Sequence, residues 1–299
     1  MKLKVLLWNV QDLFIFMDKY QGEDLSLMAE PQWQLLTTSL KNNKELNKVK
    51  GLAECIFHQD PDICLLTEVG GLESLENFNT HFLNNEYFIY HHPSNSDRGI
   101  DLGILCKKSL KPITQFKFHK HKVFARGVMQ CQLNLNNGSK YIFLLTHLKS
   151  KLNKLGDFEG RTQRQKEVSK IIDIYKKVSE DGKIPTFVSG DLNGIIFQSE
   201  TEFELSQFAT KCGLFDIFEH LNKTHFDRSS YVYYNDLGHA NLMQLDYFLV
   251  PKQWKHFIDS SSQIIDFDGT ERKTLVSSIK EKMRCPSDHY PVLINLNLS

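Results

Sequence analysis

The stretch Val128–His147, VMQCQLNLNNGSKYIFLLTH, decides the fold class. It contains two runs of β-forming apolar residues, Val128–Leu135 and Tyr141–Thr146, which are joined by Asn136–Gly138. Asn-Gly between two such runs is typical of a tight β-hairpin, because both residues tolerate a positive φ. We therefore predict that part of the sheet is antiparallel, and we do not expect a purely doubly wound parallel fold.

Short apolar runs recur on both sides of this hairpin, and two stretches between them have helical spacing. The helical stretches are Lys48–His58 and Arg164–Val178, in which apolar residues recur every three or four positions. Strands interleaved with helices predict an α/β protein that mixes parallel and antiparallel strands. The other candidate strands are Leu3–Trp8, Ile63–Leu66, Phe88–Tyr90, Leu102–Cys106, Thr186–Ser189, Leu245–Val250 and Val292–Leu298.

The composition indicates a folded globular chain. Of the 299 residues 41% are hydrophobic, while 16 Gly and 8 Pro are too few for a disordered or linker-rich protein. No apolar run approaches the ~20 residues that span a bilayer. Asn9 and Asp12 interrupt the apolar start of the sequence, and no signal-peptide cleavage site follows. The six cysteines form no CxxC pair. We therefore expect a cytoplasmic protein with reduced thiols, with non-classical export left open.

No internal repeat and no Pro/Gly/Ser-rich linker divides the sequence. We therefore expect a single domain over residues 1–299, with insertions at 18–47 and 260–283. The first insertion is polar and has no clear period, and the second begins with a Ser-Ser-Ser turn followed by a charged stretch. We expect a monomer, since no feature of the sequence indicates a protein partner.

Polar residues follow the apolar strands at six places. The carboxyl ends of strands are where α/β sheets usually bind ligands. A single carboxylate there is usually a helix cap or a turn former, but six such endings together indicate a functional site. The residues are Asn9, Glu68, His147, Asp191 with Asn193, Asp246, and Asp288 with His289.

This set contains the groups that hydrolysis of a phosphate ester requires. Glu68, Asp288 and the Asn9 amide offer oxygen ligands that suit Mg²⁺ or Mn²⁺, whereas zinc prefers more His or Cys. Two histidines can divide the proton transfers between activation of water and stabilisation of the leaving oxygen. Asp191 and Asn193 are two apart, so in an extended chain both would point to one face.

The same motifs carry a resemblance to a known family. In order along the chain they match the endonuclease/exonuclease/phosphatase superfamily, and the chain is identified as resembling a member of it. The resemblance implies a four-layer α/β/β/α sandwich, in which two mixed β-sheets pack face to face between helices and the site lies at one edge. The motifs are Trp8–Val10, Asp62–Glu68, Thr146–Leu148, Ser189–Asn193, Leu245–Leu249 and Ser287–Pro291.

The resemblance also implies a role for each site residue. Glu68 resembles the family's metal carboxylate, with Asn9 and Asp288 beside it. Asp191 and Asn193 resemble the pair that positions the attacking water, binds phosphate and, in some relatives, holds a second metal.

In the same comparison, Asp246 resembles the carboxylate that orients His289. His147 stands where deoxyribonucleases and sphingomyelinases carry a histidine and abasic-site repair enzymes a tyrosine, which argues against abasic-site repair. Two positions depart from the family pattern: Thr67 replaces a common Gln before the metal glutamate, and Gln11 stands where relatives carry a charged residue.

Three arginines are further candidates for contact with the substrate phosphate. Arg98 lies on a Gly-containing turn before a strand, and Arg161 and Arg164 open the helix after Lys149-Ser150. The alternatives are a surface ion pair for Arg98 and a solvated helix face for the other two.

The distribution of charge bears on the substrate. The 36 Lys+Arg balance the 36 Asp+Glu, yet residues 102–156 contain eleven basic residues, Lys154 among them, and no acidic residue. Such a run can simply solubilise a surface. Because this basic run leads into His147, we favour the interpretation that its positive electrostatic field attracts a polyanion to the site. Nucleic acid is then the expected partner.

The sequence therefore predicts a Mg²⁺-dependent phosphodiesterase, with Mn²⁺ as the other suitable ion. Within that class we favour an endonuclease that acts on DNA or RNA with low sequence specificity. A sphingomyelin or phospholipid phosphodiesterase and an inositol-phosphate phosphatase of the same superfamily are the alternatives. From another class, the alternative is a catalytically silent relative that binds a phosphorylated partner.

Overall fold

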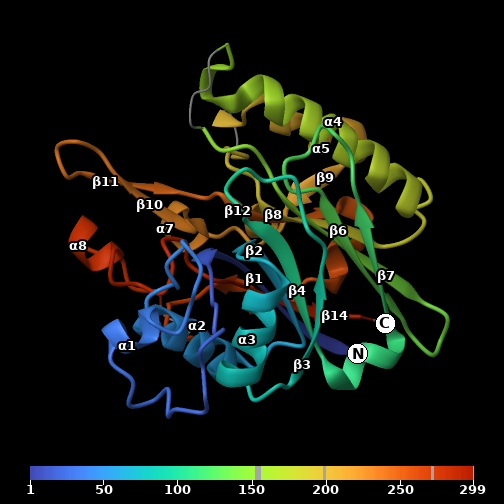
Figure 1. The fold of residues 1–299 in the computed structure, drawn as a ribbon. Helices are drawn as coiled ribbons and strands as arrows, with labels where there is room; N and C mark the ends of the chain where they lie inside the picture. The colour runs from blue at the N-terminus through green and yellow to red at the C-terminus, as the bar shows by residue number, and fades with distance from the viewer. Residues whose placement is uncertain (152–155, 198–199, 271–272, 299) are drawn as a thin grey trace.

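Two six-stranded mixed sheets form the centre of the structure, a computed structural model that describes residues 1–151, 156–197, 200–270 and 273–298 (Figure 1). The first sheet has the order β13 (Gln263–Ile264), β14 (Val292–Asn297), β1 (Lys2–Leu13), β2 (Ile63–Val69), β4 (Asp101–Lys107) and β3 (Tyr87–His91). The second has the order β5 (Thr114–His119), β6 (Val128–Asn134), β7 (Lys140–His147), β8 (Thr186–Asp191), β12 (Asp246–Pro251) and β9 (Leu214–Asp216).

Helices cover the outer face of each sheet. α1 (Glu30–Gln34), α2 (Leu46–Gln59) and α3 (Leu72–Phe82) lie on the side of the first sheet, and α4 (Arg161–Val178) and α5 (Phe203–Cys212) lie on the second (Figure 1). This arrangement of helix, sheet, sheet and helix confirms the predicted four-layer sandwich. None of the helices in the described ranges is long and apolar enough to cross a membrane.

A separate two-stranded hairpin extends from the side of the sandwich (Figure 1). It consists of β10 (Tyr231–Tyr234) and β11 (Ala240–Met243). The short helices α7 (His225–Arg228) and α8 (Ile279–Lys282) lie near it, and α6 (Ile217–His220) follows β9.

The hairpin predicted from Val128–His147 is confirmed. β6 and β7 pair antiparallel, and Gly138 in the turn has a φ of +86°. β7 then pairs with β8 in parallel, which makes the sheet mixed. The first sheet is mixed as well, since β1 pairs in parallel with β2 and antiparallel with β14.

β7 shows why its apolar run is unbroken. Tyr141, Phe143 and Leu145 point into the core between the two sheets, whereas Ile142 and Leu144 belong to a second cluster under α4 and α5. Because side chains alternate along a strand, a strand buried on both faces needs apolar residues at every position.

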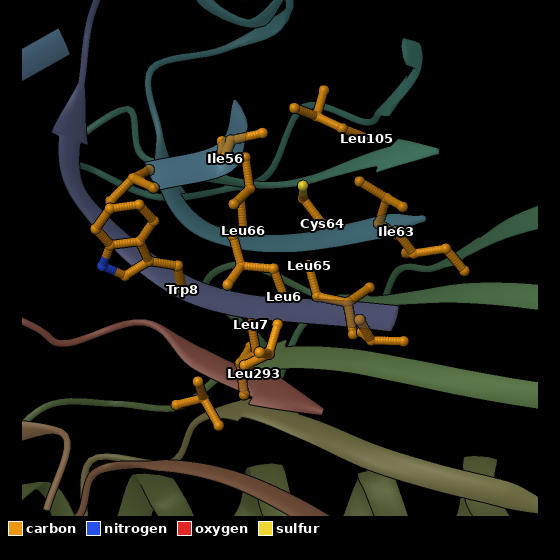
Figure 2. Packing of buried hydrophobic residues seen from close by; sticks show 14 of the residues in the cluster. Leu6, Leu7, Trp8, Ile56, Ile63, Cys64, Leu65, Leu66, Leu105 and Leu293 are labelled. Atoms are coloured by element: carbon orange, nitrogen blue, oxygen red, sulfur yellow. The ribbon is translucent and has the colours of Figure 1, made fainter. Parts of the chain in front are cut away.

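The first sheet is packed in the same way against its helices. Figure 2 shows Trp8 of β1, Leu66 of β2 and Ile56 of α2 in one buried cluster. α2 spans two residues more at its start and one more at its end than the predicted stretch Lys48–His58. This packing fixes the carboxyl ends of β1 and β2, where Asn9 and Glu68 lie.

The two predicted insertions contain ordered structure. Residues 18–47 include α1, and Trp33 of that helix is fully buried. Residues 260–283 include β13 and α8, and positions 271–272 within this stretch lie outside the described residues. The first insertion is anchored to the end of β1, because the Lys44 amide donates to the Phe14 carbonyl at 2.8 Å.

Candidate active site

Strand register brings three of the predicted residues into one row. His147 at the end of β7 and Asp246 at the start of β12 both pair with Asp191 at the end of β8. Nε2 of His147 lies 3.4 Å from Oδ2 of Asp191. All three side chains are buried, so the row lies just inside the edge of the second sheet.

A glycine makes this row possible. Gly190, which precedes Asp191, has a φ of +143°, and a Cβ atom there would lie 1.8 Å from the Thr146 carbonyl oxygen. A larger residue would force β7 and β8 apart. The Ser189-Gly-Asp191 sequence therefore sets the spacing between Asp191 and the end of β7.

His289 joins the row from the first sheet. Its Nδ1 lies 2.7 Å from Oδ2 of Asp246, and its Nε2 lies 4.0 Å from Oδ2 of Asp191. The loop before β14 is tied to β1, because Trp8 Nε1 donates to the His289 carbonyl at 2.7 Å and Ser287 Oγ donates to the Asn9 carbonyl at 2.6 Å. The backbone of His289 is thus tied to β1, while Asp246 holds its imidazole.

Asn9 and Glu68 come from neighbouring strands of the first sheet. Asn9 Nδ2 donates to Oδ2 of Asp191 at 3.0 Å and lies 3.3 Å from Oε1 of Glu68. Its Oδ1 accepts a hydrogen bond from the Gln11 amide at 3.0 Å. As placed, the Asn9 amide therefore bridges two carboxylates as a donor, and its oxygen could bind a metal only after the amide turned over.

Glu68 lies at an irregularity of β2. The register between β2 and β4 shifts between Thr67 and Val69, and Glu68 itself has a φ of +63°. Such bulges redirect a side chain, and strained backbone of this kind is common at functional sites. Here the bulge turns the carboxylate toward Asn9 and His147.

The surroundings of Glu68 fit a bound cation. Its nearest polar neighbours are Asn9 at 3.3 Å, Arg98 at 3.5 Å and His147 at 4.0 Å, and its side chain is only 12% exposed. Within the described part of the chain, none of these contacts reaches the ~2.8 Å of a charge-assisted hydrogen bond. A buried carboxylate without a short partner is costly, and a divalent ion would offset that cost.

Asp288 is half-buried, and its charge acts on Glu68. Burial, followed by the charges of Asp12 and Asp288, raises the pKa of Glu68. Two or three oxygen ligands with room for water match the preference of Mg²⁺. Glu68, Asp288 and the Asn9 oxygen are thus the residues that could hold the ion.

A second group could also hold a metal. Asp191, Asp246 and His289 offer ligand atoms that all lie within 4.8 Å of one another. Oδ1 of Asp246 is buried and has no hydrogen-bond partner among the described residues. In this group, however, His289 Nδ1 already contacts Asp246, and a set with an imidazole suits Mn²⁺ or zinc better than Mg²⁺.

The two histidines have opposite electrostatic settings. Burial lowers the pKa of His147 well below its usual value, and the charge of Arg126 lowers it further. Burial also lowers the pKa of His289, but the negative charges of Asp246, Asp288 and Asp191 outweigh it and raise that pKa to about 10. Burial raises the pKa of Asp191. The site therefore pairs a neutral histidine with a protonated one.

Asn193 does not continue the strand. β8 ends at Asp191, and Asn193 has a φ of +50° with its amide nitrogen 2.9 Å from Oδ1 of Asp191. Its side chain donates to the Leu148 carbonyl at 3.2 Å. The expectation of an extended Asp191–Asn193 segment was therefore wrong, and a tight turn brings Asn193 close to the end of β7 instead.

The three candidate arginines differ in their surroundings. Arg98 is 53% exposed, contacts both oxygens of Asp12 at 2.8 and 2.9 Å, and lies at the site next to Glu68. Arg161 is exposed and pairs with Glu159 at 2.7 Å. Arg164 is fully buried and pairs with Glu202 and Glu204 at 2.9 and 2.6 Å. Because its side chain is fully buried, Arg164 has no surface to offer a phosphate, and its prediction as a phosphate contact was wrong.

The described part of the basic segment 102–156 does not form one track into the site. β7 runs from Lys140 to His147, so Lys140 lies a whole strand length from the site, and Lys107 pairs with Asp60 at the same distant end. Arg126 and Lys149 lie at the site end. Lys154 lies outside the described residues.

Two residues near the site were not singled out from the sequence. Arg126 is buried, its Nε has no hydrogen-bond partner among the described residues, and its charge acts on Glu68 and Asp191. Ser230 Oγ accepts hydrogen bonds from the amides of Leu245 and Asp246 at 3.1 and 3.0 Å. Membership of the basic segment 102–156 was the sequence signal for Arg126, and none pointed to Ser230.

Comparison with known proteins identifies the family of the chain and finds solved structures with a similar fold. Residues 4–297 match the sequence model of the Endonuclease/Exonuclease/phosphatase family. A search of curated protein sequences found no match.

Solved structures resemble this chain over nearly its whole length. Truncated Caenorhabditis elegans TDP2 is 18% identical, with 99% of this chain and 98% of that chain covered and a TM-score of 0.62. The human nocturnin catalytic domain with bound sulfate is 16% identical, with 100% and 95% covered and a TM-score of 0.62. A mannosyl-6-phosphatase of Bacteroides thetaiotaomicron is 14% identical, with 99% and 100% covered and a TM-score of 0.55.

Proposed function

Because the chain belongs to the endonuclease/exonuclease/phosphatase family, a family of metal-dependent phosphoesterases, we propose that it is a Mg²⁺-dependent phosphodiesterase. We further propose that it acts as an endonuclease on DNA or RNA with low sequence specificity. One observation carries the proposal: Asp191 lies within 4.0 Å of both His147 and His289, and Asp246 orients His289 at 2.7 Å. We also propose that the chain forms one domain, since the site uses residues from position 9 to position 289.

In the proposed mechanism, Asp191 and Asn193 position the attacking water at the end of β8. Oδ1 of Asp191 accepts from the Asn193 amide and Oδ2 accepts from Asn9 Nδ2. Because Oδ2 is the oxygen near both histidines, it is the one that would accept a proton from water. Protonated His289 donates from Nε2 to a phosphate oxygen and stabilises the charge that develops there. Neutral His147 faces the same carboxylate and can hydrogen-bond to the phosphate or to the water.

Glu68 and Asp288 would hold the metal in this mechanism, and the Asn9 oxygen would join them if its amide turned over. A divalent ion at this position would neutralise phosphate charge and activate a bound water. Arg98 lies next to Glu68 and remains a proposed phosphate contact, and Arg161 stays a more distant one. A TDP2 structure from D. rerio holds a single-strand DNA product. The similarity of this chain to that structure supports nucleic acid as the proposed substrate class.

The experiment is a cleavage assay with purified protein. Supercoiled plasmid, single-stranded DNA and RNA are incubated with Mg²⁺, with Mn²⁺ and with chelator, and His289→Ala serves as the inactive control. We expect metal-dependent cleavage that the chelator abolishes. Turnover of a phospholipid, an inositol phosphate or a sugar phosphate without cleavage of any nucleic acid would contradict the nuclease assignment. Binding of Mg²⁺ without turnover of any phosphate ester would indicate a silent relative.

A further inference from the structure

A pocket of about 720 Å³ opens beside the proposed metal carboxylate, where the insertion 18–47 meets the end of β1. Its walls include Gln11, Asp12, Phe14, Lys41, Lys44 and Arg98. Arg98 connects it to the site, because its guanidinium also lies 3.5 Å from Glu68. The pocket therefore adjoins the place proposed for the scissile phosphate.

The wall of this pocket is fixed by buried hydrogen bonds. The Lys44 amide donates to the Phe14 carbonyl at 2.8 Å. The Lys44 carbonyl accepts from Trp33 Nε1 at 2.8 Å. Asn43 Oδ1 accepts from the Phe16 amide at 2.7 Å. A binding wall that is already ordered does not lose conformational entropy when a ligand arrives.

Four cations line the pocket, and two of them form no ion pair among the described residues; the carboxylates of its lining are Asp12, Glu45 and Asp97. Arg98 pairs with Asp12 and Lys48 with Glu45. Lys41 and Lys44, by contrast, have no carboxylate partner in the described ranges: Lys44 Nζ donates to the Gln11 carbonyl at 2.8 Å, and Lys41 Nζ donates to the Arg98 carbonyl. Lys41 Nζ also lies 4.0 Å from the centre of the Phe14 ring.

These lysines are set up to bind an anion. An ammonium group can donate three hydrogen bonds, so a single carbonyl leaves donors for a ligand. Lys44 is only 8% exposed, and a bound anion would add to the charges of Asp12, Asp288 and Glu68 that already offset part of the cost of burying its ammonium group. A hydrogen-bonded path links it to the site, since Gln11 contacts Lys44 through its carbonyl and Asn9 through its amide.

We propose that this pocket is a subsite for a second phosphate group of the substrate, bound by Lys41 and Lys44 while the scissile phosphate lies at Asp191. The inference rests on the proposed function and narrows it. The subsite would favour substrates that carry another phosphate close to the bond that is cleaved. A nucleic acid strand and a small polyphosphate both satisfy this requirement, and a strand is the substrate class that we propose.

The test uses a dinucleotide that contains one phosphodiester. Its turnover is compared to that of the same dinucleotide carrying an added terminal phosphate, at one end or at the other. In the unaltered protein, we expect the added phosphate at one of the two ends to raise kcat/KM. Lys41→Ala and Lys44→Gln should each reduce that advantage by about tenfold, or about 1.4 kcal/mol, mainly through KM. Turnover of the dinucleotide without the added phosphate should change by less than about twofold.

Lys50→Ala is the matched control. Lys50 Nζ also donates to a carbonyl, that of Ser26 at 3.2 Å, but Lys50 does not line the pocket. Lys41 is exposed, so Lys41→Ala tests the inference even if the more buried Lys44→Gln variant fails to fold. The control should retain the full advantage of the added phosphate.

The outcomes separate the two proposals. Failure of the unaltered protein to cleave any phosphodiester would overturn the proposed function. Cleavage with no benefit from the added phosphate, or an equal loss on both substrates in Lys41→Ala, would overturn the subsite alone. In a parallel assay with soluble inositol bisphosphates, turnover that is sensitive to Lys41→Ala would support the subsite but assign it to a small polyphosphate.

Discussion

Nδ1 of His289 lies 2.7 Å from Oδ2 of Asp246, although the two residues are 43 positions apart in the chain. Asp246 begins a strand of the second sheet, and His289 lies in the loop that enters a strand of the first. Their hydrogen bond thus crosses from one sheet to the other. It turns Nε2 of His289 toward Asp191.

Substitution of this pair should reduce catalysis more than binding. We expect His289→Ala to lower kcat by at least ~10²-fold, because it removes a group that stabilises charge or transfers a proton. Asp246→Asn should lower kcat by a smaller factor, since the imidazole loses its orienting carboxylate but remains present. Steady-state kinetics on a nucleic acid substrate measure both, with exposed His256→Ala as the control. Rates near normal in His289→Ala would refute the assignment.

Glu68→Gln should weaken the response to metal. The substitution keeps the shape of the side chain but removes its charge, so we expect the Mg²⁺ concentration for half-maximal activity to rise at least ~10-fold. A titration of activity with Mg²⁺, and of Mn²⁺ binding by calorimetry, measures the change. Glu54→Gln on the exposed face of α2 is the control and should titrate like the unaltered protein. An unchanged metal response in Glu68→Gln would place the ion elsewhere, with the cluster around Asp246 as the next candidate.

Arg164→Met should destabilise the fold instead of impairing substrate binding. The change leaves Glu202 and Glu204 without their buried partner, and loss of one member of a buried ion pair costs about 3–5 kcal/mol. Urea denaturation measures the free energy of unfolding. Arg161→Ala, on the exposed start of the same helix, should change it by less than about 0.5 kcal/mol. A large increase in KM with unaltered stability in Arg164→Met would restore Arg164 as a phosphate contact.

Asp259 gives the stability a defined dependence on acid pH. Hydrogen bonds from the amide and hydroxyl of Ser261 and from Asn297 lower the pKa of Asp259 from 3.8 to about 2. A carboxylate whose pKa is lowered by folding stabilises the protein above pH 3.8, and that contribution is lost as the pH falls toward about 2. The difference in unfolding free energy between the unaltered protein and Asp259→Asn should therefore shrink across this window. A difference that is constant with pH would contradict this.

The sequence predicted the nine strands that have a simple physical signature, but it missed β5, β9, β10, β11 and β13. β7 is apolar from Tyr141 to Leu145 since both of its faces are buried, and Gly138 in the turn before it has the left-handed backbone that favours glycine. The polar ends of the strands were also readable, and the register then brings His147, Asp191 and Asp246 into one row.

What the sequence could not supply were contacts made across long separations. Arg164 looks like an exposed residue at the start of a helix, and only the fold places it against Glu202 and Glu204. Arg126 was one cation among eleven until the fold placed its charge next to Asp191. Local backbone also misled the prediction at Asn193, where a left-handed residue ends the strand earlier than the motif spacing suggested.

The pairing of β1 with β14 has a consequence for synthesis of the protein. Lys2 pairs with Asn297, so β1 gains its antiparallel neighbour only when β14 has emerged from the ribosome. His289 reaches Asp246 and Asp191 through the loop that leads into β14. A nascent chain, however much of the second sheet it has folded, therefore lacks an assembled site, and any hydrolytic activity begins only after translation has passed residue 289.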